Sequence, residues 1–164
     1  MLILMLFMFV AISAIPIFIA IFIAILKKYF PKINVGKSPF WLPILAACVF
    51  FFSFFVPDIH ISNETETFQQ HFIGGGIFCT LMFFYLAGVL NIKYNFLLGI
   101  IYVFIFTSAL GIANELLEFS LLKLGIFEIK MTDTSWDLVA NTSGAISSFI
   151  ILFFPYNFFL RKQN

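Results

Sequence analysis

Charged side chains are scarce in this sequence. It has 9 Lys and Arg and 8 Asp and Glu among 164 residues, which is 10% of the chain. A soluble domain of this size exposes much of its surface to water and needs far more charge than this. The net charge of +1 provides neither a basic surface for nucleic acid nor an acidic tail for a cationic partner. We therefore expect a membrane protein without a nucleic-acid partner.

Cysteine is equally rare, and its positions suggest no metal or redox chemistry. Cys48 and Cys79 both lie in apolar runs and match neither a paired metal-binding motif nor a secreted disulfide framework. A free thiol in such a run usually serves as a small hydrophobic side chain. The sequence leaves any cofactor unknown.

Apolar residues make up the rest of the chain, with 62% hydrophobic residues, 26 phenylalanines and a mean hydropathy of +1.08. Crossing about 30 Å of hydrocarbon takes roughly 17 to 25 apolar residues. The first such run is longer than the core of a signal peptide and has no basic residues before it, so we expect a retained transmembrane helix. The sequence predicts an all-α, polytopic integral membrane helix bundle forming one domain over residues 1–164. It has about five transmembrane helices, at residues 2–26, 40–56, 72–90, 96–117 and 136–154.

The basic residues predict the orientation, because Lys and Arg of short loops stay in the cytoplasm. With five spans, one side receives the basic residues of the first connection, the third connection and the C-terminal tail: Lys27, Lys28, Lys32, Lys37, Lys93, Arg161 and Lys162. The second connection contains Asp58, Glu64 and Glu66 but no basic residue, and it falls on the other side. We expect insertion in the inner (cytoplasmic) membrane, with the N-terminus outside and the C-terminus in the cytoplasm.

This topology gathers the unusual polar residues at the outer face of the membrane. They come from the second connection, the end of the fourth span and the start of the fifth: Asp58, His60, His71, Asn114, Glu115, Glu118, Asp133, Asp137 and Asn141. A carboxylate facing hydrocarbon costs about 2.5 kcal/mol or more. Several carboxylates at one membrane face therefore require partners.

Helical spacing predicts which way the side chains of the fifth span point. Asp137, Asn141, Gly144 and Ser148 recur every three or four residues and form one stripe. A polar stripe that includes a glycine is expected to face protein. Glu115 and Glu118 likewise share one side of the fourth span with Gly111, and small residues allow two helices to approach closely. We therefore expect the two stripes to face each other.

The chemistry of this cluster is left open by the sequence. Neighbouring carboxylates raise one another's pKa, so Glu115, Glu118 and Asp137 can share a proton. Alternatively, a divalent cation can take oxygen ligands from the carboxylates and Asn141 and a nitrogen ligand from His71.

Simpler roles are also open for most of these residues. Asp133 and Asp137 can favour the positive end of a helix dipole, with Thr134 and Asp137 forming a capping box. The glutamates and His71 can be interfacial residues that reach water. Asn141 lies beyond the first helical turn, so capping does not explain it.

Three short motifs resemble the VanZ-like family of bacterial membrane proteins. They are QQHFIGGG, which contains His71; NELLEF, which contains Glu115 and Glu118; and WDLVANTSGA, which contains Asp137, Asn141 and Gly144. The resemblance covers residues 58–154 and implies that these six residues are the polar signature of the family. It also implies work at the cell envelope, since the member that gave the family its name is associated with reduced susceptibility to teicoplanin.

The chain departs from the pattern of this family at three places. The family often has Asp-Lys shortly before its histidine, where this chain has residues 67–70, TFQQ. Its Glu-x-x-Gln motif ends with Glu118 here, and an arginine often found before the aspartate corresponds only to Lys130, at a shifted spacing.

Three functions compete at this stage. The first is an envelope protein that binds or modifies a lipid or lipid-linked wall precursor at the extracytoplasmic face. In a catalytic version Glu115 or Asp137 is a general base or metal ligand, His71 carries a proton or binds metal, and Glu118 and Asn141 complete the site. The second is a structural or interaction protein whose polar cluster only sets helix packing. The third, an ion or proton conductor, is disfavoured because the inner halves of the spans have almost no polar residues.

Overall fold

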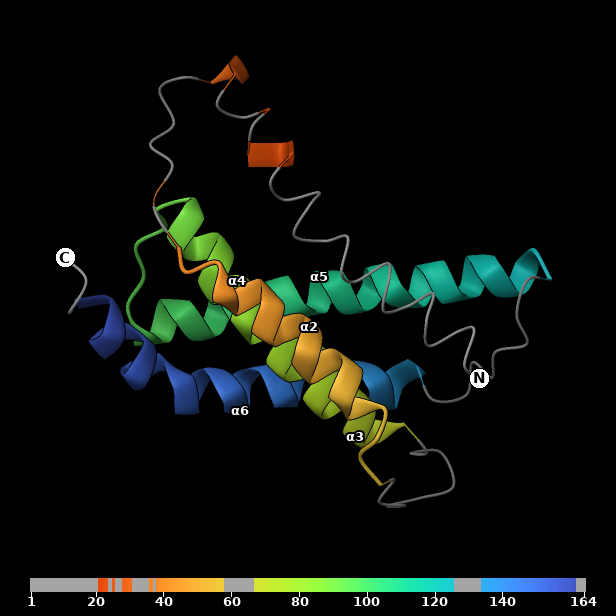
Figure 1. Cartoon of the computed structure of the whole chain (residues 1–164). Helices are drawn as coiled ribbons and strands as arrows, with labels where there is room; N and C mark the ends of the chain where they lie inside the picture. Colours follow the sequence, from red (N-terminus) through yellow and green to blue (C-terminus); the bar gives the residue numbers. More distant parts are fainter. Residues whose placement is uncertain are drawn as a thin grey trace.

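The computed structural model describes residues 21–23, 25, 28–30, 36, 38–57, 67–125 and 134–161, and all its elements within these ranges are helices (Figure 1). Their bounds are Trp41–Ser53 for α2, Phe68–Gln70 for α3, His71–Ile77 for the π-helix η1, Phe78–Val89 for α4, Phe96–Lys123 for α5 and Thr134–Arg161 for α6. The all-helical fold class is thus confirmed for this part of the chain.

Three helical segments among the described residues are long and apolar enough to cross a membrane. They are Phe68–Val89, which joins α3, η1 and α4, Phe96–Lys123, and Thr134–Phe158. The second predicted span is a helix of only 13 residues, α2. At a rise of about 1.5 Å per residue it extends roughly 20 Å, less than the hydrocarbon thickness. The first predicted span lies almost entirely outside the described residues.

The helices α5 and α6 lie side by side and run in opposite directions, and α2 and α4 cross them diagonally as a second pair (Figure 1). The end of α5, the start of α6 and the short α3 consequently come to the same end of the bundle. This arrangement brings polar residues from three separate parts of the chain together.

Local signals in the sequence explain where α4 ends and α5 begins. Asn91 adopts a left-handed conformation (φ 52°), and the N–H groups of Asn91 and Ile92 bond back to the carbonyls of Gly88 and Ala87 at 3.2 and 2.8 Å. These two bonds form a Schellman motif. The side chain of Asn95 then caps α5 by accepting a 2.9 Å hydrogen bond from the Leu98 N–H.

Two predicted helix ends were wrong in the same direction. The fourth span was expected to end at residue 117, but α5 continues to Lys123 and is followed by Gly125, which has a φ of 67°. The fifth was expected to end at residue 154, but α6 continues through Pro155. The Asn157 amide donates a 2.8 Å hydrogen bond to the Phe153 carbonyl in this last part. Both helices therefore extend beyond their apolar runs.

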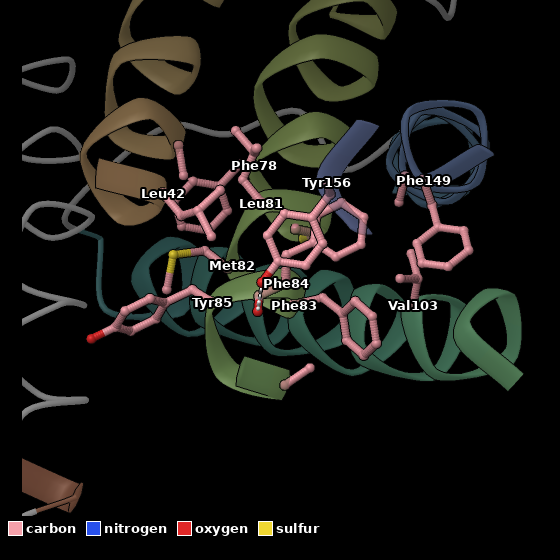
Figure 2. Close-up of a cluster of buried hydrophobic side chains, with 14 of the residues drawn as sticks. Leu42, Phe78, Leu81, Met82, Phe83, Phe84, Tyr85, Val103, Phe149 and Tyr156 are labelled. Atoms are coloured by element: carbon pink, nitrogen blue, oxygen red, sulfur yellow. Dashed lines mark hydrogen bonds between the residues drawn. The ribbon is translucent and has the colours of Figure 1, made fainter. Parts of the chain in front are cut away.

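The core forms around α4, which is the central helix of the bundle. In the most apolar 18-residue stretch of Phe68–Val89, 67% of the residues are buried, against 22% in the corresponding stretch of α5. Phe84 stacks on Tyr156 at 4.3 Å and on Phe149 at 5.5 Å between ring centroids. The Tyr156 hydroxyl donates to the Phe84 carbonyl at 3.1 Å (Figure 2). Aromatic side chains thus hold α6 against α4, while α5 leaves most of its surface exposed.

Candidate functional site

An aspartate, a histidine and a threonine meet where the segment α3–η1 contacts α6. The His71 Nε2 atom lies 3.4 Å from the Asp137 Oδ1 atom, and the Thr67 hydroxyl donates a 3.1 Å hydrogen bond to the same oxygen. Asp137 is 5% exposed, whereas the His71 side chain is 23% exposed. The carboxylate is therefore held inside the bundle, and the imidazole connects it to the surface.

Helical spacing explains why Thr67 and His71 reach the same carboxylate. They are four residues apart, and the His71 N–H bonds to the Thr67 carbonyl at 3.1 Å, which closes one helical turn. Their side chains therefore lie on one face, toward α6. The Asp137 carboxylate thus joins two chain segments, a role that a capping residue in the first turn of α6 does not have.

Asn141 occupies the next turn of α6 and is 7% exposed. Its Oδ1 atom lies against Gly75 of η1, in the space that a Cβ atom on that glycine would take. Its Nδ2 atom is 3.8 Å from the Cβ position of Gly111 on α5. The amide is therefore placed among three helical segments, as the facing stripes of α5 and α6 predict.

The three consecutive glycines of η1 form the surface on which the neighbouring helices pack. Gly74 lies against the Ser53 side chain of α2, and a Cβ at Gly76 would be 2.6 Å from the backbone of Gly144 on α6. The glycine run is therefore a helix-packing surface. A π-helix is wider than an α-helix and often occurs at functional sites. Here the π-helix begins at His71 itself.

The polar stripe continues deeper along α6. The Thr80 hydroxyl of α4 lies 2.7 Å from the Ser148 hydroxyl and donates to the Ala145 carbonyl at 2.8 Å. Asp137, Asn141, Gly144 and Ser148 are all buried. The expectation that this stripe faces protein is therefore confirmed.

The carboxylates of α5 approach the cluster from the third helix. The Asn114 amide donates a 2.7 Å hydrogen bond to the Glu118 carboxylate. Glu118 also interacts electrostatically with Glu115, His71 and Asp137. The Glu115 Oε1 atom is buried and has no hydrogen-bond partner among the described residues. One buried carboxylate oxygen is thus left without a donor.

The structure therefore brings together all five residues that the sequence selected. His71, Asp137, Asn141, Glu115 and Glu118 lie at one end of the bundle. Three other expected members, Asp58, His60 and Asp133, lie outside the described residues. So do Glu64 and Glu66 of the second connection and Lys130, the counterpart of the family arginine.

The described residues do not provide a metal site of the expected kind. No three His, Cys, Asp or Glu side chains in the described ranges are arranged to hold a metal ion. The two close groups, His71 and Asp137, are paired with each other.

Thr67 and Thr80 are two polar contacts that the sequence analysis did not select. Thr67 precedes His71 by one helical turn, a spacing that identifies it as a neighbour once the helix is extended toward the N-terminus. Thr80 has no such signal, because its partners Ala145 and Ser148 are far away in the sequence.

The comparisons with known proteins add no relative to this picture. No protein-family model, no curated protein and no solved structure matches this chain.

Proposed function

We propose that this chain is a VanZ-like integral membrane protein of the bacterial cell envelope. It binds or modifies a lipid or lipid-linked wall precursor at the extracytoplasmic face of the inner membrane, and this activity contributes to glycopeptide (teicoplanin) resistance. In this proposal the chain crosses the membrane about five times, with its N-terminus outside and its C-terminus in the cytoplasm. The polar end of the bundle, from Thr67 to His71 and around Asp137, then faces outward.

One observation carries the proposal: at the end of three long apolar segments, the Asp137 carboxylate accepts a hydrogen bond from Thr67 and lies 3.4 Å from the His71 imidazole. A carboxylate beside an imidazole orients the ring. The partly exposed His71 is then placed to exchange a proton with a polar headgroup. Such a pair, close to apolar helix surfaces, suits a substrate that has both a polar headgroup and a hydrocarbon chain.

The α5 carboxylates add a second layer to the proposed site. Glu118 is held by Asn114 and is electrostatically coupled to both members of the pair. A proton or a hydrogen-bond donor that a bound lipid brings to one of these groups therefore changes the hydrogen bonding and the electrostatic environment of the others. In this proposal Asp137 positions His71, while His71, Glu118 and Glu115 are the groups that meet the headgroup.

A structural role is the second candidate, and the contact of Asn141 with Gly75 favours it. A buried amide at a helix crossing can fix helix register without any ligand. In that case substitution of His71 or Asp137 lowers the stability of the protein and causes no separate loss of activity.

Teicoplanin susceptibility in a sensitised host distinguishes the two candidates. We compare the wild type with Asp137→Asn and His71→Gln, and Ser143→Ala is the matched control because its hydroxyl only bonds to its own helix at Val139. Protein abundance in the membrane and thermal stability in detergent are measured for each variant. The proposal requires that the two site variants lose resistance at normal abundance. Retained resistance at normal abundance would refute it, and loss only in proportion to abundance supports the structural role.

A further inference from the structure

An apolar groove opens between the second half of α5 and the start of α6, beside the polar cluster. It has a volume of about 440 Å³ and is lined by Ile112, Glu115, Leu116, Phe119, Thr134 and Leu138. Ile112, Leu116 and Phe119 recur every three or four residues along α5 and are all exposed. The groove is therefore an apolar stripe that is open to the surrounding hydrocarbon.

Among the described residues that line this groove, Glu115 is the only ionisable one. Its Oε1 atom is buried and has no donor among the described residues. Burying a carboxylate oxygen without a hydrogen bond is costly, and more so next to hydrocarbon. A ligand in the groove that brings an N–H or O–H group removes this cost.

The surrounding charges select among such ligands. Glu118 already accepts from Asn114 and repels a second anion near Glu115, to which it is electrostatically coupled. The Lys123 ammonium, which would attract an anion, lies over the Phe119 ring at 5.4 Å from its centroid and is not among the described residues that line the groove. Glu115 lines the groove and Glu118 is coupled to it, so a cationic headgroup is favoured over phosphate or carboxylate.

We propose that this groove binds an amphiphile whose headgroup carries a primary ammonium group. The chain lies along Ile112 and Leu116, and the ammonium donates a hydrogen bond to the Glu115 Oε1 atom. A quaternary ammonium lacks an N–H and leaves that oxygen unpaired, so it binds less well. This inference rests on the proposed lipid-binding function and names the class of headgroup.

Tryptophan fluorescence tests the inference directly. Trp136 lies in the first turns of α6, between the groove residues Thr134 and Leu138. The sequence has one other tryptophan, Trp41 of α2, and Trp41→Phe leaves Trp136 as the single reporter. The full chain in this background is placed in four sets of nanodiscs. Each set contains the same fraction of a different dibrominated C18 probe. The probes are a primary amine, its trimethylammonium analogue, an alcohol and a carboxylate, and their bromines quench only nearby tryptophan.

The expected order of quenching places the primary amine first, by several-fold over the trimethylammonium and carboxylate probes. Glu115→Gln is expected to remove this preference, while all four probes still bind. Leu116→Phe reduces quenching by every probe because it fills the groove. Ile105→Phe is its matched control: this exposed position lies on nearly the same face of α5, three turns before Leu116 and two turns before the first groove residue, Ile112.

Several outcomes overturn the inference. Equal quenching by all four probes, or an amine preference that survives in Glu115→Gln, shows that Glu115 does not select the headgroup. Quenching that is insensitive to Leu116→Phe shows that the groove is not the binding site. The proposed function has its own test, and it fails if Asp137→Asn retains resistance at normal abundance. The two failures are therefore distinguishable.

Discussion

The amide oxygen of Asn141 rests against the backbone of Gly75, in the space where any other residue would place its Cβ atom. This contact joins α6 to the π-helix one turn below the pair of His71 and Asp137. It couples the packing of two spans to the geometry of the proposed site.

Gly75→Ala is expected to destabilise the protein by about 1–3 kcal/mol, since the new methyl group overlaps the Asn141 side chain. The second substitution Asn141→Ala removes that side chain and restores part of the lost stability. Gly76→Ala is the comparison, because its methyl group meets the backbone of Gly144 and Ala145, which no side-chain change can remove. Thermal unfolding in detergent measures all of these variants. The packing account is wrong if Asn141→Ala rescues both glycine variants equally or neither of them.

The pair of His71 and Asp137 is expected to contribute a coupling energy of about 0.5–2 kcal/mol, the range for polar contacts between membrane helices. A double-mutant cycle with His71→Gln and Asp137→Asn measures this energy from thermal or denaturant unfolding. The cycle of His71→Gln with Ser143→Ala is its control, and we expect additive effects there. Additive effects in the first cycle would show that the two side chains do not stabilise each other.

Thr80→Val is expected to lower the free energy of unfolding by about 1 kcal/mol, because it removes the hydroxyl that bonds to Ala145 and Ser148 in the core. Ser120→Ala removes a hydroxyl that is exposed and bonds only to its own helix at Leu116. It should leave stability within about 0.5 kcal/mol of the wild type. A Thr80→Val protein as stable as Ser120→Ala would contradict the buried hydrogen bond.

Opposite ends of α5 are expected to label from opposite sides of the membrane. Its 28 residues extend about 42 Å, enough to cross the bilayer between Lys93 and Leu124. In a Cys48→Ala background, in which Cys79 remains buried, Leu124→Cys should react with an impermeant maleimide in intact cells. Lys93→Cys should react only after permeabilisation. Labelling of both positions from one side would contradict a span at α5, and the reverse pattern would contradict the proposed orientation.

The parts of this structure that the sequence could predict depend on local spacing. The stripe from Asp137 to Ser148 repeats with the period of a helix, and a lipid-facing alternative is too costly for its polar groups. The prediction that the stripes of α5 and α6 face each other rested on Gly111 and the topology alone. For the same reason the five selected polar residues could be expected at one end of the bundle.

Other features depend on contacts between distant segments and carry no local signal. The π-helical turn at His71 follows from the packing of three glycines against α2 and α6, which the sequence of η1 does not specify. The end of α5 at Lys123 is an exception, because Gly125 two residues later is a local signal for it, but a scan for apolar runs alone does not use that signal. Thr80 finds partners 65 and 68 residues away.

The widened helix at residues 71–77 also sets how this bundle tolerates changes in chain length. A π-helical segment closes each turn with an extra residue, so loss of one residue there lets the helix continue as an ordinary α-helix. Seven residues of π-helix turn through nearly the same angle as six residues of α-helix, because the π-helix has more residues per turn. Thr67 and His71 would therefore still face Asp137 while the aromatic core around Phe84 stays in place. The same deletion within α4, which is already α-helical, would instead rotate everything before it by about 100° around the helix axis. Residues 71–77 are thus the part of this span where the chain can lose one residue and keep its polar cluster assembled.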